Sequence, residues 1–376
     1  MHTYKIAVIP GDGIGPEVVA EGLKVLDAVS RKYNFKVEKT FFDYGGQRYL
    51  KTGQALSDDE LNGLRGFDAI YLGAVGHPDV KSGILERGIL LKLRFGLDLY
   101  INLRPVQLFK NVETLIKNKK PEDIDYWVVR ENTGDVYTGE GQVQQKGTKE
   151  EIAIQYMKYS YQQVERCVRF AFKSVMARHD KQKPWRGLTK EETSKGFIGK
   201  VTLCGKTNVL TYVFDLWERV FHEVAKEFPQ VKTDYVHVDA MCIHMIESPQ
   251  RFDAIVTSNM FGDIITDLAA VTQGGMGVAP SGNINPNGVS MFEPVHGSAP
   301  QFAGKGAANP LAAILTVKLM LEHLKQDAAA ADINAAAQAV MLKMKSMLIG
   351  QMGYNTMEIG DMVVGAINNR LYGACK

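Results

Sequence analysis

The sequence predicts an α/β fold. Strand-like apolar runs alternate with amphipathic helical patterns along the chain, which favours this class. The chain has 376 residues, which suggests one large or two ordinary domains, and 45% of them are apolar, which is ample for a core. The first strands and the last helices read as one regular α/β layer, so we expect the two domains to interleave along the chain.

The first elements follow from a short apolar run and the turn behind it. Ile6–Ile9 is predicted to be a strand, and Glu17–Tyr33 an amphipathic helix opened by Pro16, a residue well suited to a first helical turn. Further strands are expected at Phe35–Phe42, Ala69–Gly73, Tyr126–Arg130, Lys200–Cys204, Thr233–Val238 and Ala254–Ser258. Further helices are expected at Asp58–Leu64, Thr148–Arg178, Asn208–Glu227, Asp263–Val271, Pro310–Leu324 and Asp332–Leu348.

Two stretches interrupt this alternation. His179–Gly199 is polar, and we expect an exposed connection between a helix and a strand. Thr272–Asn287 is rich in Gly, Pro and Asn, which suits a hinge or a loop beside a cofactor.

Composition argues against several classes of function. The formal net charge is only +2, so a broadly basic surface for nucleic acid or anionic membranes is not indicated. The apolar runs are far shorter than the ~20 residues of a membrane span, and the first residues read as a strand and turn without a signal peptide. The four cysteines, including Cys375, are scattered and without metal-site spacing. We therefore expect a cytoplasmic protein with reduced thiols.

The glycine-rich stretch "GDGIGPE" resembles a dinucleotide-binding turn but lacks two of its features. Counted from Gly11, the place of the third glycine is taken by Pro16. The nearest acid after the second strand, Asp43, lies too far along to hold a ribose. We therefore interpret Gly11 and Gly13 as a tight strand–helix turn rather than a Rossmann fingerprint.

Three arginines are candidates for binding carboxylates. Each guanidinium can hold a carboxylate through two parallel hydrogen bonds. Arg130 ends an apolar strand, and Arg104 lies between Leu103 and Pro105. With Arg94 they indicate a small polycarboxylate ligand, although a solvated surface position is the common alternative for a single arginine.

A second cluster is acidic. Asp263 and Asp267 are four residues apart, so both carboxylates leave one face of the first turns of a predicted helix. Such oxygen ligands suit Mg²⁺ or Mn²⁺, and Asp239, at an expected strand end, could complete the site. The alternative is that these acids merely stabilise the start of the helix.

Tyr137 and Lys206 are candidates for proton transfer. A lysine next to a cation-bound hydroxyl can act as a base, and a tyrosine can donate a proton. For either residue alone, an exposed lysine and a packed tyrosine are the ordinary alternatives. The segment Met291–Pro310 is rich in small residues that let a flat ligand approach the backbone, and it carries His296 and Asn309.

The whole chain resembles the metal-dependent β-decarboxylating dehydrogenases, the family of isopropylmalate, isocitrate, homoisocitrate and tartrate dehydrogenases. The motifs that carry the resemblance are "IPGDGIGPEV", "NLRP", "VREN", "VDA", "NMFGDIITDLA" and "FEPVHGSAP". It implies a two-domain, non-Rossmann fold with mixed central sheets flanked by helices, and a homodimer whose active sites are shared. The domain ranges expected are 1–106 plus 276–376 on the cofactor side and 107–275 on the dimer and metal side.

The resemblance also implies a role for each candidate residue. Arg94, Arg104 and Arg130 bind the carboxylates of a 2-hydroxy dicarboxylate, Tyr137 protonates the carbanion carbon after CO₂ leaves, and Lys206 of the neighbouring subunit handles the hydroxyl proton. Asp263 and Asp267 ligate Mg²⁺ or Mn²⁺, with Asp239 reaching in from the partner. The residues that fall in the family's cofactor site are Glu293, His296, Gly297, Ser298, Ala299, Gln301 and Asn309.

The loop before Arg94 indicates the substrate. Leu90 and Leu91 are placed to contact an apolar branch, and "LERGILLKLRF" resembles the isopropylmalate members. We expect NAD-dependent conversion of 3-isopropylmalate to 4-methyl-2-oxopentanoate. Tartrate, malate, other 3-alkylmalates and isocitrate stay open as substrates. NADP stays open as cofactor, since Gln301 replaces the Asp of NAD-using members.

Overall fold

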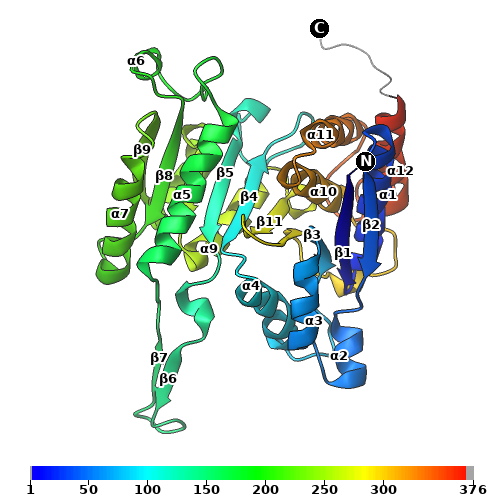
Figure 1. The fold of residues 1–376 in the computed structure, drawn as a ribbon, viewed down its shortest axis with the longest axis horizontal. Coiled ribbons are helices and arrows are strands. Elements are labelled where there is room, and N and C mark those ends of the chain that lie inside the picture. The colour runs from blue at the N-terminus through cyan, green and yellow to red at the C-terminus, as the bar shows by residue number, and fades with distance from the viewer. Residues whose placement is uncertain (1, 370–376) are drawn as a thin grey trace. The chain divides into compact units, whose positions relative to one another are not determined.

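The computed structural model describes residues 2–369, which fall into two compact units (Figure 1). Unit 1 comprises Met1–Leu99, Gln107–Pro121 and Ala270–Lys376, within the described range, and unit 2 comprises Tyr100–Val106 and Glu122–Ala269.

These units differ from the expected domain ranges in three segments, 100–106, 107–121 and 270–275. Residues 101–106 belong to a strand that lies beside a strand of unit 2. Residues 107–121 are held in unit 1, where the Gln107 amide donates to Gln273 Oε1 at 2.7 Å.

The strands of unit 1 lie in the order β2-β1-β3-β12-β11. The pairs β1–β2, β1–β3 and β3–β12 are parallel, whereas β11–β12 is antiparallel, so the arrangement is mixed as expected. Their bounds are β1 Thr3–Gly11, β2 Lys36–Phe41, β3 Ala69–Ala74, β11 Pro280–Ile284 and β12 Ser290–Pro294.

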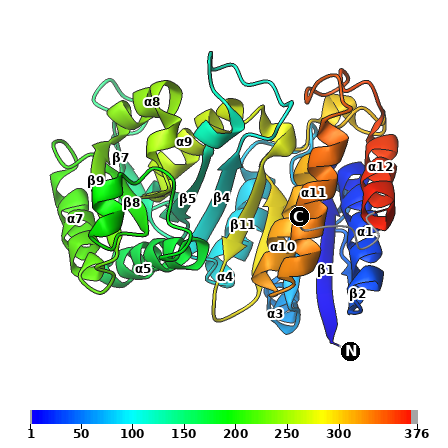
Figure 2. The ribbon, with the colours of Figure 1, turned by 90° about the horizontal axis from the view of Figure 1, so that it is seen from above.

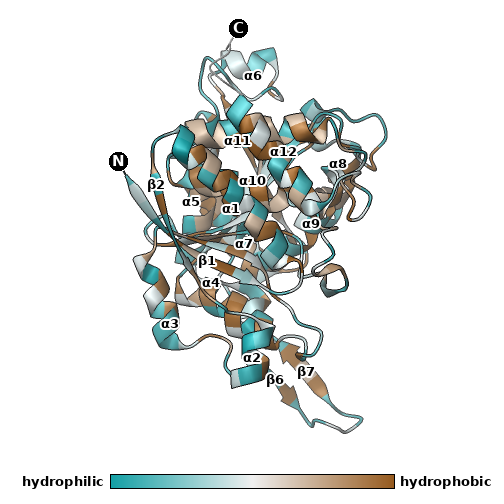
Figure 3. Ribbon diagram, turned by 90° about the vertical axis from the view of Figure 1, so that its right-hand side faces the viewer, coloured by the Kyte–Doolittle hydropathy of each residue, from teal (hydrophilic) through white to brown (hydrophobic). Residues whose placement is uncertain are grey.

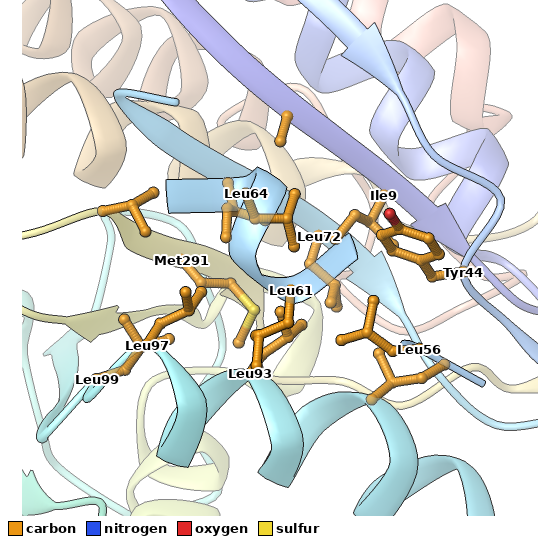
Figure 4. Close-up of a cluster of buried hydrophobic side chains, with 14 of the residues drawn as sticks. Ile9, Tyr44, Leu56, Leu61, Leu64, Leu72, Leu93, Leu97, Leu99 and Met291 are labelled. Carbon is orange, nitrogen blue, oxygen red and sulfur yellow. The ribbon is translucent and has the colours of Figure 1, made fainter. Parts of the chain in front are cut away.

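Two groups of helices cover these strands. The bounds are α1 Gly15–Lys32, α2 Gly46–Thr52, α3 Asp58–Gly63, α4 Lys92–Gly96, α10 Leu311–His323, α11 Asp327–Met341 and α12 Thr356–Asn369. Helices α1, α10, α11 and α12 pack against one another (Figure 2). Strand residues such as Ile9 and Leu72 belong to a hydrophobic core cluster of unit 1. This cluster also contains Leu61 from α3 and Leu93 from α4 (Figure 4).

The strands of unit 2 lie in the order β4-β5-β10-β8-β9. Their bounds are β4 Ile101–Gln107, β5 Asp125–Glu131, β8 Gly199–Gly205, β9 Val231–His237 and β10 Ala254–Thr257. Strand β10 runs parallel to both β5 and β8, and Thr257 pairs with Arg130 on one side and Cys204 on the other. The carboxyl ends of these strands therefore meet at one edge, where Arg130 and the residues after β8 and β10 lie.

The helices of unit 2 are α5 Tyr161–Arg178, α6 Lys190–Ser194, α7 Thr211–Ala225, α8 Val238–Glu247 and α9 Asn259–Thr272, whose last turn enters unit 1. Helices α5 and α7 pack side by side. A separate hairpin, β6 Gly141–Gln144 with β7 Ile152–Gln155, extends from the rest of unit 2 (Figure 3).

Four predictions about elements are wrong in part. The expected helix Thr148–Arg178 begins only at Tyr161, because Ser160 and Gln163 form a capping box there and the residues before it include β7. The expected helix Asp332–Leu348 is α11, which begins five residues earlier and ends at Met341. Thr272–Asn287 contains β11, and the His179–Gly199 connection contains α6 and the buried Trp185.

Among the described residues, no helix combines the length and apolar character that a bilayer crossing needs. Cys167, Cys204 and Cys242 are free thiols in the structure, and Cys375 lies outside the described residues.

Candidate active site

Arg130 is the centre of the candidate site in unit 2. It is the residue before the last in β5 and is only 1% exposed. Its Nε donates to Asn259 Oδ1 at 2.9 Å, and its Nη1 donates to Asp263 Oδ1 at 2.5 Å. Helix α9 approaches this arginine so closely that a Cβ on Gly262 would lie 2.4 Å from Arg130 Cγ. The close approach brings the first turns of α9 to the end of β5.

Tyr137 lies against the same carboxylate. Its hydroxyl donates to Asp263 Oδ2 at 2.7 Å, and its ring lies 5.4 Å from the Arg130 guanidinium. The structure therefore gathers three of the predicted residues, from β5, from the 3-10 turn Asp135–Thr138 and from α9.

Arg104, on β4, faces the next turn of α9. Its Nη1 donates to Thr266 Oγ1 and lies 3.7 Å from Asp267 Oδ1, while its Nη2 lies 3.8 Å from Asp263 Oδ1. Its Nε donates to Asn102 Oδ1 at 2.9 Å. Two guanidinium groups thus hold positive charge beside the acidic face of α9.

The acidic face suits a hard divalent cation in its donor chemistry. Asp263 and Asp267 lie one helical turn apart, and their side chains are 45% and 61% exposed. Carboxylate oxygens are the ligands that Mg²⁺ and Mn²⁺ prefer, and Mg²⁺ commonly keeps several waters. Within residues 2–369 no three His, Cys, Asp or Glu side chains gather as a metal-binding group, so Asp239 does not join these two within one chain.

Lys206 and Asp239 form a separate pair. Lys206 follows β8, and its Nζ lies 2.7 Å from Asp239 Oδ1. The hydrogen bond from Lys206 holds the pKa of Asp239 below its usual value. Asp239 lies in the first turn of α8 and not at a strand end, because β9 stops at His237.

In unit 1, Arg94 and Glu293 lie close together. Arg94 Nη2 is 3.3 Å from Glu293 Oε1, which also accepts a hydrogen bond from Asn283 Nδ2 at 2.8 Å. Both side chains are largely buried. Glu293 is thus held in place by two donors from its own unit.

Leu90 and Leu91 lie in a π-helical turn, Glu86–Leu91, that leads into α4. Such turns are rare and frequently occur at functional sites. Leu90 packs against the core cluster of unit 1, whereas Leu91 is half-buried outside that cluster. Leu91 is therefore the freer of the two for contact with a ligand.

The segment from His296 to Asn309 has features of a ligand-binding loop. His296 Nδ1 lies 3.0 Å from Gly297 O, while Nε2 is buried and has no hydrogen-bond partner among the described residues. Burial lowers the pKa of His296, which favours a neutral ring. Ala299 takes a left-handed φ of +39°, and a Cβ on Gly297 would meet open space. A neutral ring with an unpaired nitrogen fits a heteroaromatic base such as adenine.

The last residues of the predicted cofactor set differ in their surroundings. Gln301 is exposed. Asn309 is buried, its Nδ2 donates to Met347 O at 3.0 Å, and its Oδ1 accepts from the Leu311 amide at 3.0 Å. Asn309 therefore also holds the start of α10, a structural role that the sequence reading did not anticipate.

Sequence reasoning missed three partners of the arginines: Asn102, Asn259 and Thr266. Asn102 and Arg104 are two residues apart on β4 and therefore share a face, a signal that the strand period could have revealed. Asn259 lies two residues after β10 and begins α9, and Thr266 lies three residues after Asp263 on the same helix.

Comparison with known proteins gives a consistent result. Residues 5–363 match the family model described as isocitrate/isopropylmalate dehydrogenase. The chain is 52% identical over 337 residues to a 3-isopropylmalate dehydrogenase of Thermobifida fusca, covering 89% of this chain and 90% of that protein. It is 50% identical over 362 residues to a 3-isopropylmalate dehydrogenase of Streptomyces griseus, covering 96% and 97%.

Solved structures show the same fold. An isocitrate dehydrogenase from Methylococcus capsulatus superposes with a TM-score of 0.82 at 32% identity, covering 98% of this chain and 99% of that one. A β-decarboxylating dehydrogenase from Thermococcus kodakarensis superposes with a TM-score of 0.74 at 30% identity, covering 97% and 96%.

Proposed function

This chain belongs to the isocitrate/isopropylmalate dehydrogenase family, and we propose that it converts 3-isopropylmalate to 4-methyl-2-oxopentanoate with NAD as oxidant, a step of leucine synthesis. The observation that carries this proposal is an identity of about half over nearly the whole length to 3-isopropylmalate dehydrogenases. The candidate acid, base, arginines and acidic face that the reaction needs are all present in the chain.

The arginines bind and orient the substrate. In this proposal Arg94, Arg104 and Arg130 bind the carboxylates of the substrate. Arg130 is well suited because it is buried and its Nε is held by Asn259, so its orientation costs little on binding. Bidentate contacts from several arginines select a dicarboxylate over a monocarboxylate.

Two residues move the protons. Lys206 would take the proton from the hydroxyl at C2, and NAD, when bound, would be the oxidant that accepts the hydride. After CO₂ leaves, Tyr137 gives a proton to the carbon that carried it. The Tyr137 hydroxyl already donates to Asp263 at 2.7 Å, so its proton points toward the acidic face where the substrate oxygens would lie.

Asp263 and Asp267 would hold a divalent cation, with Asp239 of the partner subunit as a further ligand. When bound, the cation would supply positive charge that polarises the oxygen on C2. Arg104 and Arg130 already contact these carboxylates, so they balance the charge of the acidic face before any cation binds.

The cofactor would bind along the segment from Glu293 to Asn309. His296 would contribute a neutral ring with an unpaired Nε2, and the open space beside the Gly297 Cα would let a ligand approach the backbone there. Gln301 can accept a hydrogen bond from a ribose hydroxyl, and although it does not repel a 2′-phosphate, neither Gln301 nor Phe302 offers that phosphate a positive charge. We therefore propose NAD as the principal cofactor, with NADP accepted less well.

The active enzyme is a homodimer with shared active sites. The β6–β7 hairpin supports this, because an isolated two-stranded sheet is marginally stable and Val143 and Ile152 are 49% and 51% exposed. Ile243 and Ile246 on α8 and Ile264 on α9 are also exposed apolar side chains. A second copy that covers these surfaces could bring Lys206 and Asp239 to the acidic face of its neighbour.

The test is reduction of NAD and NADP with Mn²⁺ and a panel of 3-isopropylmalate, isocitrate, malate and tartrate. We expect the highest kcat/KM with 3-isopropylmalate and NAD. Preferred turnover of tartrate or malate would overturn the substrate assignment, and preference for NADP would overturn the cofactor assignment.

A further inference from the structure

Asp135 is a buried carboxylate to which the proposed reaction gives no role. It is the first residue of the 3-10 turn Asp135–Thr138, which also carries Tyr137, and it is fully buried. Its φ is +73°, in the left-handed region that residues other than glycine rarely occupy. A strained, buried, charged residue two positions before a candidate acid needs a physical reason.

The contacts of Asp135 join two elements of the site. Its Oδ1 accepts the amide of Val136 at 2.8 Å, inside the turn that carries Tyr137. Its Oδ2 accepts the amide of Met260 at 3.0 Å, in the first turn of α9. One carboxylate therefore links the turn that carries Tyr137 to the helix that carries Asp263.

Tyr159 completes this link. Its hydroxyl donates to Asp135 Oδ2 at 2.9 Å and accepts the amide of Asn259 at 2.7 Å. Desolvation, with the charges of Glu131 and Asp135, raises the pKa of Tyr159, so the hydroxyl stays protonated and remains a donor.

Asn259 carries the link on to Arg130. Its backbone N–H donates to the Tyr159 hydroxyl. In its side chain, Oδ1 accepts from Arg130 Nε at 2.9 Å, and Nδ2 donates to the carbonyl of Gly134 at 3.2 Å. The hydrogen bonds thus run from Asp135 through Tyr159 and Asn259 to Arg130, which itself contacts Asp263.

We propose that Asp135 and Tyr159 are a pair of positioning residues that holds the Tyr137 hydroxyl against Asp263 and aligns Arg130 with both. The proposal rests on the proposed function, in which Tyr137 is the acid and Asp263 a cation ligand. Neither residue of the pair touches substrate. A pair that fixes the acid affects the rate of the chemical step more than the binding of substrate.

The test compares Asp135→Asn, Tyr159→Phe and the double variant in the intact enzyme. Asparagine tolerates the left-handed conformation, so Asp135→Asn keeps the turn. We expect each single variant to lower kcat about tenfold while KM changes by less than about twofold. Because both act through one hydrogen bond, the double variant should also lose about tenfold and not about a hundredfold.

A matched control is Tyr161→Phe, which removes a 2.7 Å hydrogen bond from a tyrosine hydroxyl to Glu223 in the same unit. Its kcat should match that of the wild type. If the losses of kcat in the two single variants multiply in the double variant, the two residues act independently and the proposal is wrong. If both single variants have a lowered Tm but an unchanged kcat, the two residues only stabilise the fold and the proposal is also wrong.

Hydrogen exchange tests the link without any substrate. Asp135→Gly keeps the left-handed turn without strain but removes the carboxylate. We expect residues 136–138 and 259–263 to lose protection together in this variant and to keep it in Tyr161→Phe. Unchanged protection would contradict the link. If the wild type oxidises none of the panel, the proposed function fails, and this exchange experiment still decides the positioning proposal.

Discussion

At the scale of single residues, one carboxylate organises the candidate site. Asp263 accepts from Arg130 and from Tyr137 through its two different oxygens. Its residue type and its place on a helix were predictable from "NMFGDIITDLA", but its partners come from 133 and 126 residues away in the chain. Contacts over such separations leave no local pattern in a sequence.

Tyr137→Phe removes the candidate acid while keeping the ring beside Arg130. We expect kcat to fall by about 10²- to 10⁴-fold, the usual contribution of a general acid, with little change in KM. Steady-state kinetics with 3-isopropylmalate checks this, with Tyr161→Phe as the control. Turnover near that of the wild type would contradict the role of Tyr137.

Leu91→Ser tests the apolar contact with the substrate. Removing apolar surface from a substrate pocket reduces kcat/KM for the branched substrate by about 10- to 200-fold. Malate, which has no branch, should be affected far less. An equal loss on both substrates would show that Leu91 does not contact the branch.

Leu90→Ser should differ from Leu91→Ser in its effect on stability. We expect Leu90→Ser to lower the Tm, because Leu90 packs on the core cluster.

At the scale of elements, the spacing of apolar residues predicted the strands and helices whose own residues carry a clear strand or helix period. Strands β1, β3, β5 and β8 and helices α1, α7 and α10 lie close to their expected ranges. The helix predicted from Thr148 begins only at Tyr161, and the error at residues 148–160 has a physical cause. Ile152 and Ile154 alternate as in a strand, but this signal is short, and β7 forms only by pairing with β6.

The glycine turn between β1 and α1 supports the loop that we assign to the cofactor. Gly13 has φ +59°, a Cβ there would lie 1.9 Å from Ser298 O, and the Ile14 amide donates to the same oxygen at 2.8 Å. Gly13→Ala should therefore displace Ser298, lower the Tm and raise the KM for NAD.

Thermal unfolding and NAD titration of Gly13→Ala check this expectation. Gly63→Ala is the matched control, because Gly63 has φ −58° and open space around its Cβ position. Alanine there should be neutral or stabilise the chain by about 0.4–1 kcal/mol. A Gly13→Ala variant with wild-type Tm and KM would show that the turn and the loop are not coupled.

At the scale of the whole molecule, the proposed dimer makes a specific prediction. Lys206→Ala and Tyr137→Phe homodimers should each be nearly inactive. If each site combines Tyr137 of one subunit with Lys206 of the other, a mixed dimer has one intact site. Refolding the two variants together at equal concentrations should then restore about a quarter of wild-type activity, because half of the dimers are mixed and half of their sites are intact.

Activity of the refolded mixture is the measurement, and each variant refolded alone is the control. No gain on mixing, with mixed dimers demonstrated by mass spectrometry, would show that each site is built from a single chain.

The sequence by itself determined the α/β class, the places of strands such as β3, β5 and β8, and the side chains that the chemistry requires. These properties depend on local periodicity and residue type, which neighbouring residues express directly. The sequence also excluded the Rossmann fingerprint, because Pro16 takes the place of the third glycine.

Only the tertiary structure decided how these side chains pair. It placed Asp239 beside Lys206, gave Asn309 a structural role at α10, and joined Asp135 to Tyr159 and the start of α9. The reason is geometric. Each of these contacts depends on how separate strands and helices pack, and a hydrogen bond tolerates only a few tenths of an ångström, which the spacing of residues in a chain does not specify.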